Sequence, residues 1–329
     1  MLKFTVKRLL YSVLILFFVM FLIYALIYSM PNGYVETKAR ELASRPGTGK
    51  SAAEWLADLN AQYGMDKGVV MGYFTWLGSA VTGNFGDSWA WTVPVLTQFQ
   101  NTIWYSFALG LISFILQILI AIPLGISAAR KQYSLTDYSS TVISMVCISM
   151  PTFFLATILK LIFAVKLGWL DITGMQSRDY HTLSQFGQFL DVAKHFIMPA
   201  ITLTVVSIGS LMRYTRTNML EVLNSDYIRT ARAKGVPERK VINHHAFRNT
   251  LIPLVTTLGG SLPGLFSGAL ITETLFGIRG IGYASYNSMI QGDIPFTMFY
   301  LAFIAILTLL GNLISDILYA VVDPRVRLS

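Results

Sequence analysis

The sequence contains little charge and almost no cysteine. Among its 329 residues only 13% are charged, whereas 54% are hydrophobic and the mean hydropathy is +0.56. A soluble domain of this composition would have more apolar surface than it can bury, so we predict an integral membrane protein. The single cysteine, Cys147, lies in an apolar run, which excludes a disulfide framework and a cysteine-based zinc site.

Sequence motifs of common hydrolases and metalloenzymes are also absent. There is no HExxH, no CxxC and no Gly-x-Ser-x-Gly. His244 and His245 are adjacent, so on a helix they point about 100° apart and cannot share a metal ion without further ligands. GTGKS at Gly47–Ser51 resembles the end of a phosphate-binding loop, but Ser44 stands where the full pattern requires glycine. We therefore expect Ser51 to cap a helix, and we predict no catalytic residue, no metal site and no cofactor bound by this chain.

Six apolar segments are long enough to cross a bilayer. A membrane helix needs about 20 mostly apolar residues, because hydrocarbon offers no water to satisfy backbone polar groups. The predicted spans are Leu9–Met30, Thr102–Ser127, Ser139–Val165, Phe196–Met212, Asn249–Thr272 and Ile294–Val322. Prolines fall within several of them, where neighbouring helices can compensate for lost hydrogen bonds: Pro123, Pro151, Pro199, Pro253 and Pro263. The predicted fold class is an all-α integral membrane protein with six transmembrane helices.

Lysine and arginine gather on alternate connections between these spans, which marks the cytoplasmic side. They are Lys3, Lys7 and Arg8 before the first span, Arg130 and Lys131 after the second, eight residues from Arg213 to Arg248, and Arg325 and Arg327 near the end. We therefore predict a multi-pass protein with both termini in the cytoplasm. The chain has a net charge of +8, but its basic residues lie beside the apolar spans and are not gathered on one soluble face. This is the pattern of membrane orientation, so nucleic acid is not an expected partner.

The spans divide the chain into three parts. Residues 1–30 form the N-terminal end and first span, residues 31–101 an extracytoplasmic helical cap, and residues 102–329 a core with a cytoplasmic loop at 214–250. In the cap, Ser51 and Glu54 form a capping box before apolar residues at helical spacing, Trp55, Leu56, Leu59 and Tyr63. Asp66 is expected to cap a second helix that has Val70, Tyr73, Trp76 and Leu77 on one face.

The segment between the fourth and fifth spans is the most distinctive part of the sequence. It reads DYIRTARAKGVPERKVINHHAFRNTLIP from Asp226 to Pro253, and it holds six Lys or Arg. These charges could serve orientation alone, but they exceed what orientation needs. A short helix, a break at Gly235 and a second helix returning to the membrane predict a projecting knob that docks a partner. We expect Tyr227, Ala231 and Lys234 on one face of it. The predicted docking residues are Asp226, Tyr227, Arg229, Thr230, Ala231, Arg232, Ala233, Lys234, Gly235 and Val236.

Small residues recur in the fifth span. Gly260, Gly264 and Gly268 are spaced every four residues, which predicts a small face where another helix can approach closely. The partner helix belongs either to this chain or to a second subunit.

Acidic residues lie near the ends of the last two spans. Ionisable groups at membrane depth are costly, so Glu273 and Asp316 are candidates for a translocation path. Asn312, Asp316 and Tyr319 fall on one stripe of a helix. Asp316 either contacts substrate or ties helices together. Lys160 is expected to extend to the membrane interface and receives no role.

Residues along almost the whole chain resemble one family. DYIRTARAKG at Asp226–Gly235 is similar to the EAA-type coupling loop of bacterial ABC importer permeases, in the form found in the oligopeptide and dipeptide group. Four further segments resemble the same group, namely SMPTFFLATILKLIFAVKLGWL from Ser149, GNFGDS from Gly83, GDIPF from Gly292 and GNLISDILYAVVDPRVRL from Gly311. The chain departs from the group in FGIRGIG, where Arg279 replaces the usual proline and could pair with Glu273.

The resemblance implies a type I ABC importer permease fold and a peptide importer of several subunits. These are this chain, a second homologous permease, two cytoplasmic ATPases that bind ATP and magnesium, and an extracytoplasmic peptide-binding protein. The chain itself would be a non-enzymatic subunit of the bacterial cytoplasmic membrane, coupled to the ATPases through residues 226–250. A secondary transporter acting alone would be expected to show inverted internal repeats, discontinuous spans or several acids at mid-membrane, and the sequence indicates none of these.

Overall fold

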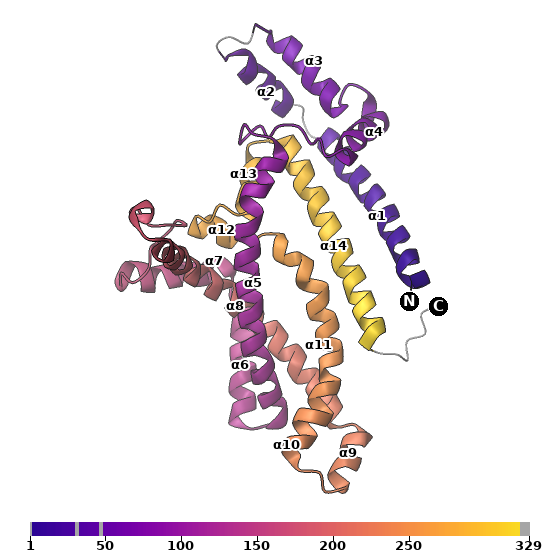
Figure 1. Ribbon diagram of the computed structural model, residues 1–329, viewed down its shortest axis with the longest axis vertical. Coiled ribbons are helices and arrows are strands. Elements are labelled where there is room, and N and C mark those ends of the chain that lie inside the picture. Colours follow the sequence, from indigo (N-terminus) through magenta and orange to yellow (C-terminus); the bar gives the residue numbers. More distant parts are fainter. Residues whose placement is uncertain (1, 30–32, 46–48, 323–329) are drawn as a thin grey trace. The chain divides into compact units, whose positions relative to one another are not determined.

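The computed structural model describes residues 2–29, 33–45 and 49–322 (Figure 1). The described residues are mostly helical, and their only extended pairing is an isolated bridge between Asp87 and Pro94. Part of the predicted features lies outside them, namely Gly47 and Thr48 of the phosphate-loop resemblance and Arg325 and Arg327 near the end of the chain.

The chain divides into two compact units. One comprises Met1–Thr102 and Ala284–Leu309, and the other comprises Ile103–Tyr283 and Leu310–Ser329. Three helices contribute residues to both units: α5 (Val95–Arg130), α13 (Ile281–Ile290) and α14 (Ile294–Val322).

Four helices in the described part of the chain are long and apolar enough to cross a membrane, or up to six spans if each of two bent pairs is one span. The four are α1 (Leu2–Ser29), α5, α8 (Gln185–Leu223) and α14. The first bent pair is α6 (Leu135–Ser149) followed by α7 (Thr152–Leu159) and a π-helix at Lys160–Lys166. The second pair comprises α10 (Glu238–Lys240), a π-helix at Val241–Ala246, α11 (Phe247–Ser261), a 3-10 helix at Leu262–Phe266 and α12 (Leu270–Phe276).

The third predicted span, Ser139–Val165, is wrong as a single straight helix. The chain bends by 100° between α6 and α7. Pro151 explains the break, because its ring disfavours a helical conformation at the preceding residue, and Met150 is extended with φ −80° and ψ 118°. The fifth predicted span is also divided, with a 47° bend at a break that contains Gly268. Other prolines remain inside helices, namely Pro123, Pro199 and Pro253.

In the first unit α1 packs against α4 (Gly68–Val81). Tyr73 and Trp76 of α4 are buried beside Tyr24 of α1. The Tyr73 hydroxyl donates a hydrogen bond to the Phe17 carbonyl oxygen at 2.8 Å. Val70, predicted on the same face as Tyr73, is instead 60% exposed. The predicted helical face of α4 is therefore narrower than the sequence pattern indicates.

The capping box at the start of α3 (Ala52–Tyr63) is confirmed. Ser51 Oγ accepts from the Glu54 N–H at 3.3 Å, and Glu54 Oε2 accepts from the Ser51 N–H at 2.6 Å. The bond from the Ser51 backbone holds the pKa of the Glu54 carboxyl below its usual value.

The predicted cap at Asp66 is wrong, because Gly64 and Gly68 adopt positive φ and leave Asp66 inside the turn that follows α3. Before α3, α2 spans Gly33–Ala43.

A buried acid joins two segments of the first unit that are distant in the sequence. Asp293 accepts hydrogen bonds from the Ser88 hydroxyl and from the Ala90 N–H, the latter at 3.2 Å. Asp293 is fully buried. Trp91 Nε1 donates to Ser288 Oγ at 3.1 Å. The motifs GNFGDS and GDIPF, which carry part of the resemblance, are therefore in direct contact.

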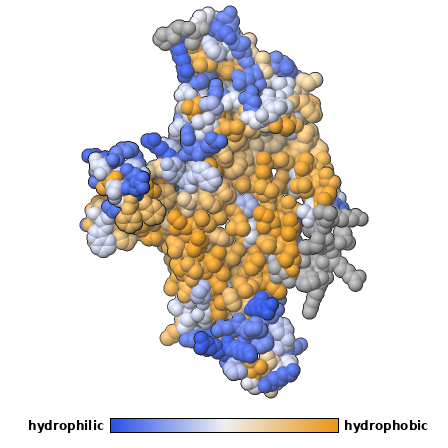
Figure 2. All heavy atoms as spheres, in the orientation of Figure 1, coloured by the Kyte–Doolittle hydropathy of each residue, from blue (hydrophilic) through white to orange (hydrophobic). Residues whose placement is uncertain are grey.

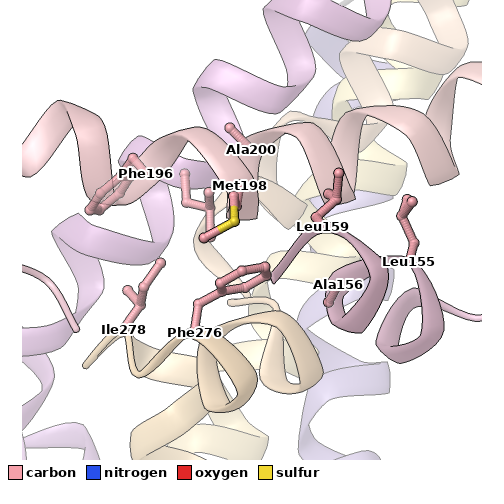
Figure 3. Packing of buried hydrophobic residues seen from close by; sticks show 9 residues of the cluster. Leu155, Ala156, Leu159, Phe196, Met198, Ala200, Phe276 and Ile278 are labelled. Carbon is pink, nitrogen blue, oxygen red and sulfur yellow. The ribbon is translucent and has the colours of Figure 1, made fainter. Parts of the chain in front are cut away.

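The second unit has a core where α7, α8 and α12 meet. Figure 3 shows Leu159 of α7, Met198 of α8 and Phe276 of α12 gathered together, and all three are buried. Lipid tails are as apolar as these side chains, so close packing and not exclusion of water holds such helices together in a bilayer. The core fixes the short helix α12 in place.

A bidentate ion pair ties α6 to α8. Asp137 Oδ1 accepts from Arg216 Nε at 2.6 Å, and Asp137 Oδ2 accepts from Arg216 Nη2 at 2.8 Å. The Tyr133 N–H also donates to Asp137 Oδ2, at 3.0 Å. Only 4% of the Asp137 side chain is exposed.

We predict that Asp137→Ala lowers the stability of the protein by about 3 kcal/mol, because it leaves Arg216 unpaired at a partly buried site. Thermal unfolding of the purified protein in detergent measures the effect. Adding Arg216→Ala should recover part of the loss. The control is Asp58→Ala, which removes an exposed pair with Lys50 and should cost less than about 1 kcal/mol. Equal losses from the two single variants would contradict the prediction.

Candidate functional site

The predicted docking segment, residues 226–250, forms a projection at one end of the second unit. In Figure 1, α9 (Asp226–Ala233) and α10 lie beyond the ends of the longer helices α8 and α11. Figure 2 shows hydrophilic residues covering this end, next to the hydrophobic surface of the helices. The arrangement agrees with a short helix, a turn and a second helix that returns to the bundle.

A small apolar core holds the projection rigidly. Ile228 of α9 is completely buried, together with Met219 of α8 and Val241 of the following π-helix. Ala129, at the end of α5, belongs to the same cluster. Side chains from α5, α8 and α9 therefore pack together in one cluster.

Gly235 closes α9 with a specific turn. Its φ is +75°, a conformation that favours glycine. The Val236 N–H donates to the Ala231 carbonyl at 3.2 Å and the Gly235 N–H donates to the Arg232 carbonyl at 3.0 Å. This is the pattern of a Schellman motif, which satisfies the carbonyls at a helix end. A Cβ on Gly235 would have no atom within 4 Å, so the glycine lies on an open surface.

The structure separates the predicted docking residues into a surface and its support. Ala231 and Val236 are half-buried and pack on the core of the projection. Ala231 follows the exposed Tyr227 by four residues and the buried Ile228 by three, so it lies at the border between the surface and the core. The other predicted residues are exposed: Asp226, Tyr227, Arg229, Thr230, Arg232, Ala233, Lys234 and Gly235.

Charge pairs organise this surface. Arg232 donates from Nη2 to Glu238 Oε1 at 2.8 Å and from Nε to Glu238 Oε2 at 3.1 Å, across the turn at Gly235. This bond raises the pKa of the Arg232 guanidinium. Arg229 lies 3.7 Å from Asp226 on the exposed side of α9. Exposed pairs contribute little stability, so these charges are available to a partner.

The glycines of the fifth predicted span do not form one helical face, because α11 ends at Ser261. Gly260 lies against α14, where a Cβ would meet Ser315 Cβ at 3.0 Å. Gly268, with φ +80°, lies against Gly282, and Gly264 has no atom within 4 Å of a Cβ.

Gly259, which does not belong to the predicted glycine pattern, also lies against α14, since a Cβ there would lie 1.9 Å from Leu318 Cδ1. The close helix packing in this region therefore involves α11 and α14 of this chain.

Glu273 is the centre of a buried hydrogen-bond network in the second unit. Its Oε1 accepts from Ser106 Oγ at 2.7 Å and from the Ala269 N–H at 2.9 Å. Its Oε2 accepts from the Tyr283 N–H at 2.8 Å. Ser106 Oγ also accepts from the Ile281 N–H at 2.8 Å. Glu273 is 0% exposed, so in this structure it holds the chain around α12 and does not line an open passage.

The predicted pair between Arg279 and Glu273 is wrong. Arg279 is exposed, and among the described residues Glu273 makes no ion pair. Gly280 brings the backbone against the carboxylate, since a Cβ there would lie 2.5 Å from Glu273 Oε2. Lys160, to which the sequence assigned no role, donates from Nζ to the Leu275 carbonyl at 2.7 Å and so holds the end of α12.

The polar stripe predicted on the last span lies in the portion of α14 that belongs to the second unit. Asn312 and Tyr319 are exposed, and Asp316 is half-buried between them. The three side chains do not join Glu273, which lies in the network around α12.

A second polar group, which the sequence analysis missed, lies on α8. Ser210, Arg213, Tyr214 and Thr217 line an open hollow of about 360 Å³ together with Ile148 of α6. Their spacing of three and four residues places them on one face, and this regularity is the signal that could have revealed them.

We predict that Glu273→Ala lowers stability by at least about 3 kcal/mol, because each stranded buried donor costs about 1–3 kcal/mol. Glu273→Gln should have an intermediate effect, since an amide N–H would then face the donor at Ser106, Ala269 or Tyr283. Thermal unfolding and the amount of folded protein in membranes measure these effects. Glu221→Ala removes an exposed acid of α8 and is the matched control. A Glu273→Ala protein as stable as this control would refute the structural role.

Comparison with known families matches both parts of the chain. The family model described as binding-protein-dependent transport system inner membrane component matches residues 121–328. The model for the N-terminal part of such membrane components matches residues 1–103.

Several well-matched relatives extend over most of the sequence. The oligopeptide transport system permease protein AppB of Bacillus subtilis is 38% identical over 267 residues, covering 81% of this chain and 83% of that protein. The di/tripeptide permease DppB of Pseudomonas aeruginosa is 34% identical over 340 residues, and the dipeptide permease DppB of Escherichia coli is 32% identical over 343. Both alignments cover 99% of each chain. The chain therefore belongs to the family of binding-protein-dependent transport system inner membrane components.

Proposed function

We propose that this chain is the permease subunit of an ATP-driven importer that passes peptides from a binding protein across the bacterial cytoplasmic membrane. Membership of the family gives the type I ABC permease fold and the role of a non-catalytic membrane component. The peptide cargo is supported by the relatives, which are named as oligopeptide, di/tripeptide and dipeptide permeases.

The observation that carries the coupling role is the rigid, charged projection at residues 226–250. Its exposed surface surrounds Gly235, and its buried side contacts α5 and α8 through Ile228. An ATPase docked on this surface would move the projection as a rigid body. Because the small core joins α9 to two membrane helices, this movement would shift them between inward-open and outward-open arrangements.

The proposed assembly contains four kinds of partner. They are a second homologous permease, two ATPases, an extracytoplasmic binding protein and the surrounding lipid. In this arrangement both termini and residues 226–250 lie in the cytoplasm, and residues 31–101 lie outside it. ATP and magnesium bind the ATPase subunits, and this chain holds no cofactor.

Replacing Gly235 by tryptophan tests the coupling role. A tryptophan side chain on this open surface would obstruct the docked ATPase. We expect Gly235→Trp to reduce both peptide uptake and peptide-stimulated ATP hydrolysis about tenfold, which corresponds to a loss of about 1.4 kcal/mol of docking free energy. The assay uses the complete transporter in proteoliposomes, and copurification of the subunits reports assembly.

The matched control is Gly168→Trp. Gly168 has φ +63° and no atom within 4 Å of a Cβ, so the strain and the added bulk are alike at a position away from the projection. The coupling role is rejected if Gly235→Trp assembles normally and retains both activities. Equal losses in the two variants would attribute the effect to backbone strain.

Asp316→Asn distinguishes the two roles considered for Asp316. The carboxylate is half-buried on α14, so we expect the variant to lower the abundance of the assembled complex about twofold, the scale produced by a loss of about 1 kcal/mol. The relative uptake of different peptides should remain unchanged. Altered peptide preference at normal abundance would place Asp316 on the path instead.

A further inference from the structure

An exposed line of hydroxyl groups runs along α8 and α11 in the second unit. On α8 the exposed residues are Ser210, Tyr214 and Thr217, and on α11 they are Thr257 and Ser261. The Thr257 hydroxyl donates to the Tyr214 hydroxyl at 3.3 Å, so the two helices share one polar surface. Helices that face lipid tails have little reason to present such groups, because polar side chains at membrane depth usually face water or protein.

Arg213 lies within this polar surface, at the edge of the hollow of about 360 Å³. It follows Met212, the last residue of the predicted fourth span. In the described part of the chain its guanidinium has no hydrogen bond and no ion pair, and it is exposed. Arg216, three residues further along, has both of its bonds to Asp137. Two neighbouring arginines of one helix therefore differ: one is bound within the protein, and the other is available.

We propose that Arg213 binds the terminal carboxylate of a peptide in transit, with Ser210 and Thr217 donating to the adjacent peptide oxygens. A guanidinium binds a carboxylate through two parallel hydrogen bonds, and the hydroxyls supply neutral donors beside it. The hollow is at the small end of the range of about 300–1,000 Å³ for ligand sites, which fits the end of a peptide and not a whole one. This inference rests on the proposed function and adds a recognised chemical group to it.

The position on α8 gives this site a place in transport. Arg213 is one helical turn from the Asp137–Arg216 pair, near the beginning of α6. In the proposed orientation this is the cytoplasmic end of the span. The carboxylate would be held there shortly before release, and an open site of exposed groups suits a weak, transient contact.

The test compares a tripeptide that has a free carboxylate with the same peptide as its C-terminal amide. Uptake is measured in proteoliposomes with the complete transporter and saturating binding protein. For each transporter, the uptake rate of the free-carboxylate peptide is divided by that of the amide, and this ratio is compared between wild type and variant. Any preference of the binding protein for one peptide affects both ratios equally and therefore cancels. We expect Arg213→Gln to reduce uptake of the free-carboxylate peptide about tenfold, as for one lost charge-assisted hydrogen bond, and uptake of the amide less than about twofold.

Two further variants complete the test. Arg213→Lys keeps the charge without the paired geometry, and it should reduce uptake of the carboxylate peptide about threefold. Arg213→Lys also tests the proposal if the complex that contains Arg213→Gln does not assemble. The control Lys131→Gln removes another exposed cation, beyond the end of α5, and should leave the uptake of both peptides unchanged.

The outcomes separate the possible failures. The proposal is overturned if either Arg213 variant changes the uptake of the two peptides equally. It is also overturned by an effect that depends on anionic phospholipid in the vesicles and not on the peptide end, because the guanidinium would then bind a lipid phosphate. A wild-type transporter that carries neither peptide would reject the proposed function itself.

Discussion

A chain that crosses hydrocarbon must satisfy its polar groups from within, and most features of this protein follow from that constraint. The backbone does so by forming helices. Wherever a helix breaks, the freed groups need other partners, and here they are supplied by buried side chains. Glu273 accepts two backbone N–H groups around α12, Lys160 donates to a carbonyl at its end, and Asp293 performs a similar role before α14.

The same two acids also bind hydroxyl groups that are distant in the sequence. Ser106 and Glu273 are separated by 167 positions, and Ser88 and Asp293 by 205. These two long-range hydrogen bonds therefore join the end of one helix to a segment much earlier in the chain. This gives rigid elements joined at a few defined points, which is the arrangement required for rocking movements of helices as bodies.

The projection at residues 226–250 uses a different principle, because it lies beyond the apolar part of the helices. It has its own small core around Ile228, and its turn depends on the positive φ of Gly235. Its apolar support and its charged surface lie on opposite sides of α9, so the proposed docking and the attachment to the bundle use different residues. The two proposed roles can therefore be altered separately by substitution.

The sequence by itself determined the membrane class, the number and approximate place of the apolar segments, the capping box at Ser51 and the outline of the projection. These depend on composition and on local spacing, which a single segment contains. It also carried the motifs of the family, because they are contiguous.

Only the tertiary structure decided how distant polar groups pair. Glu273 proved to be buried among backbone donors and not bound to Arg279, and Ala231 proved to support the surface that it was expected to form. The available state of Arg213 beside the paired Arg216 was likewise decided by which side chains the neighbouring helix α6 presents. The physical reason is that burial and pairing depend on which helices meet, and local spacing does not contain that information.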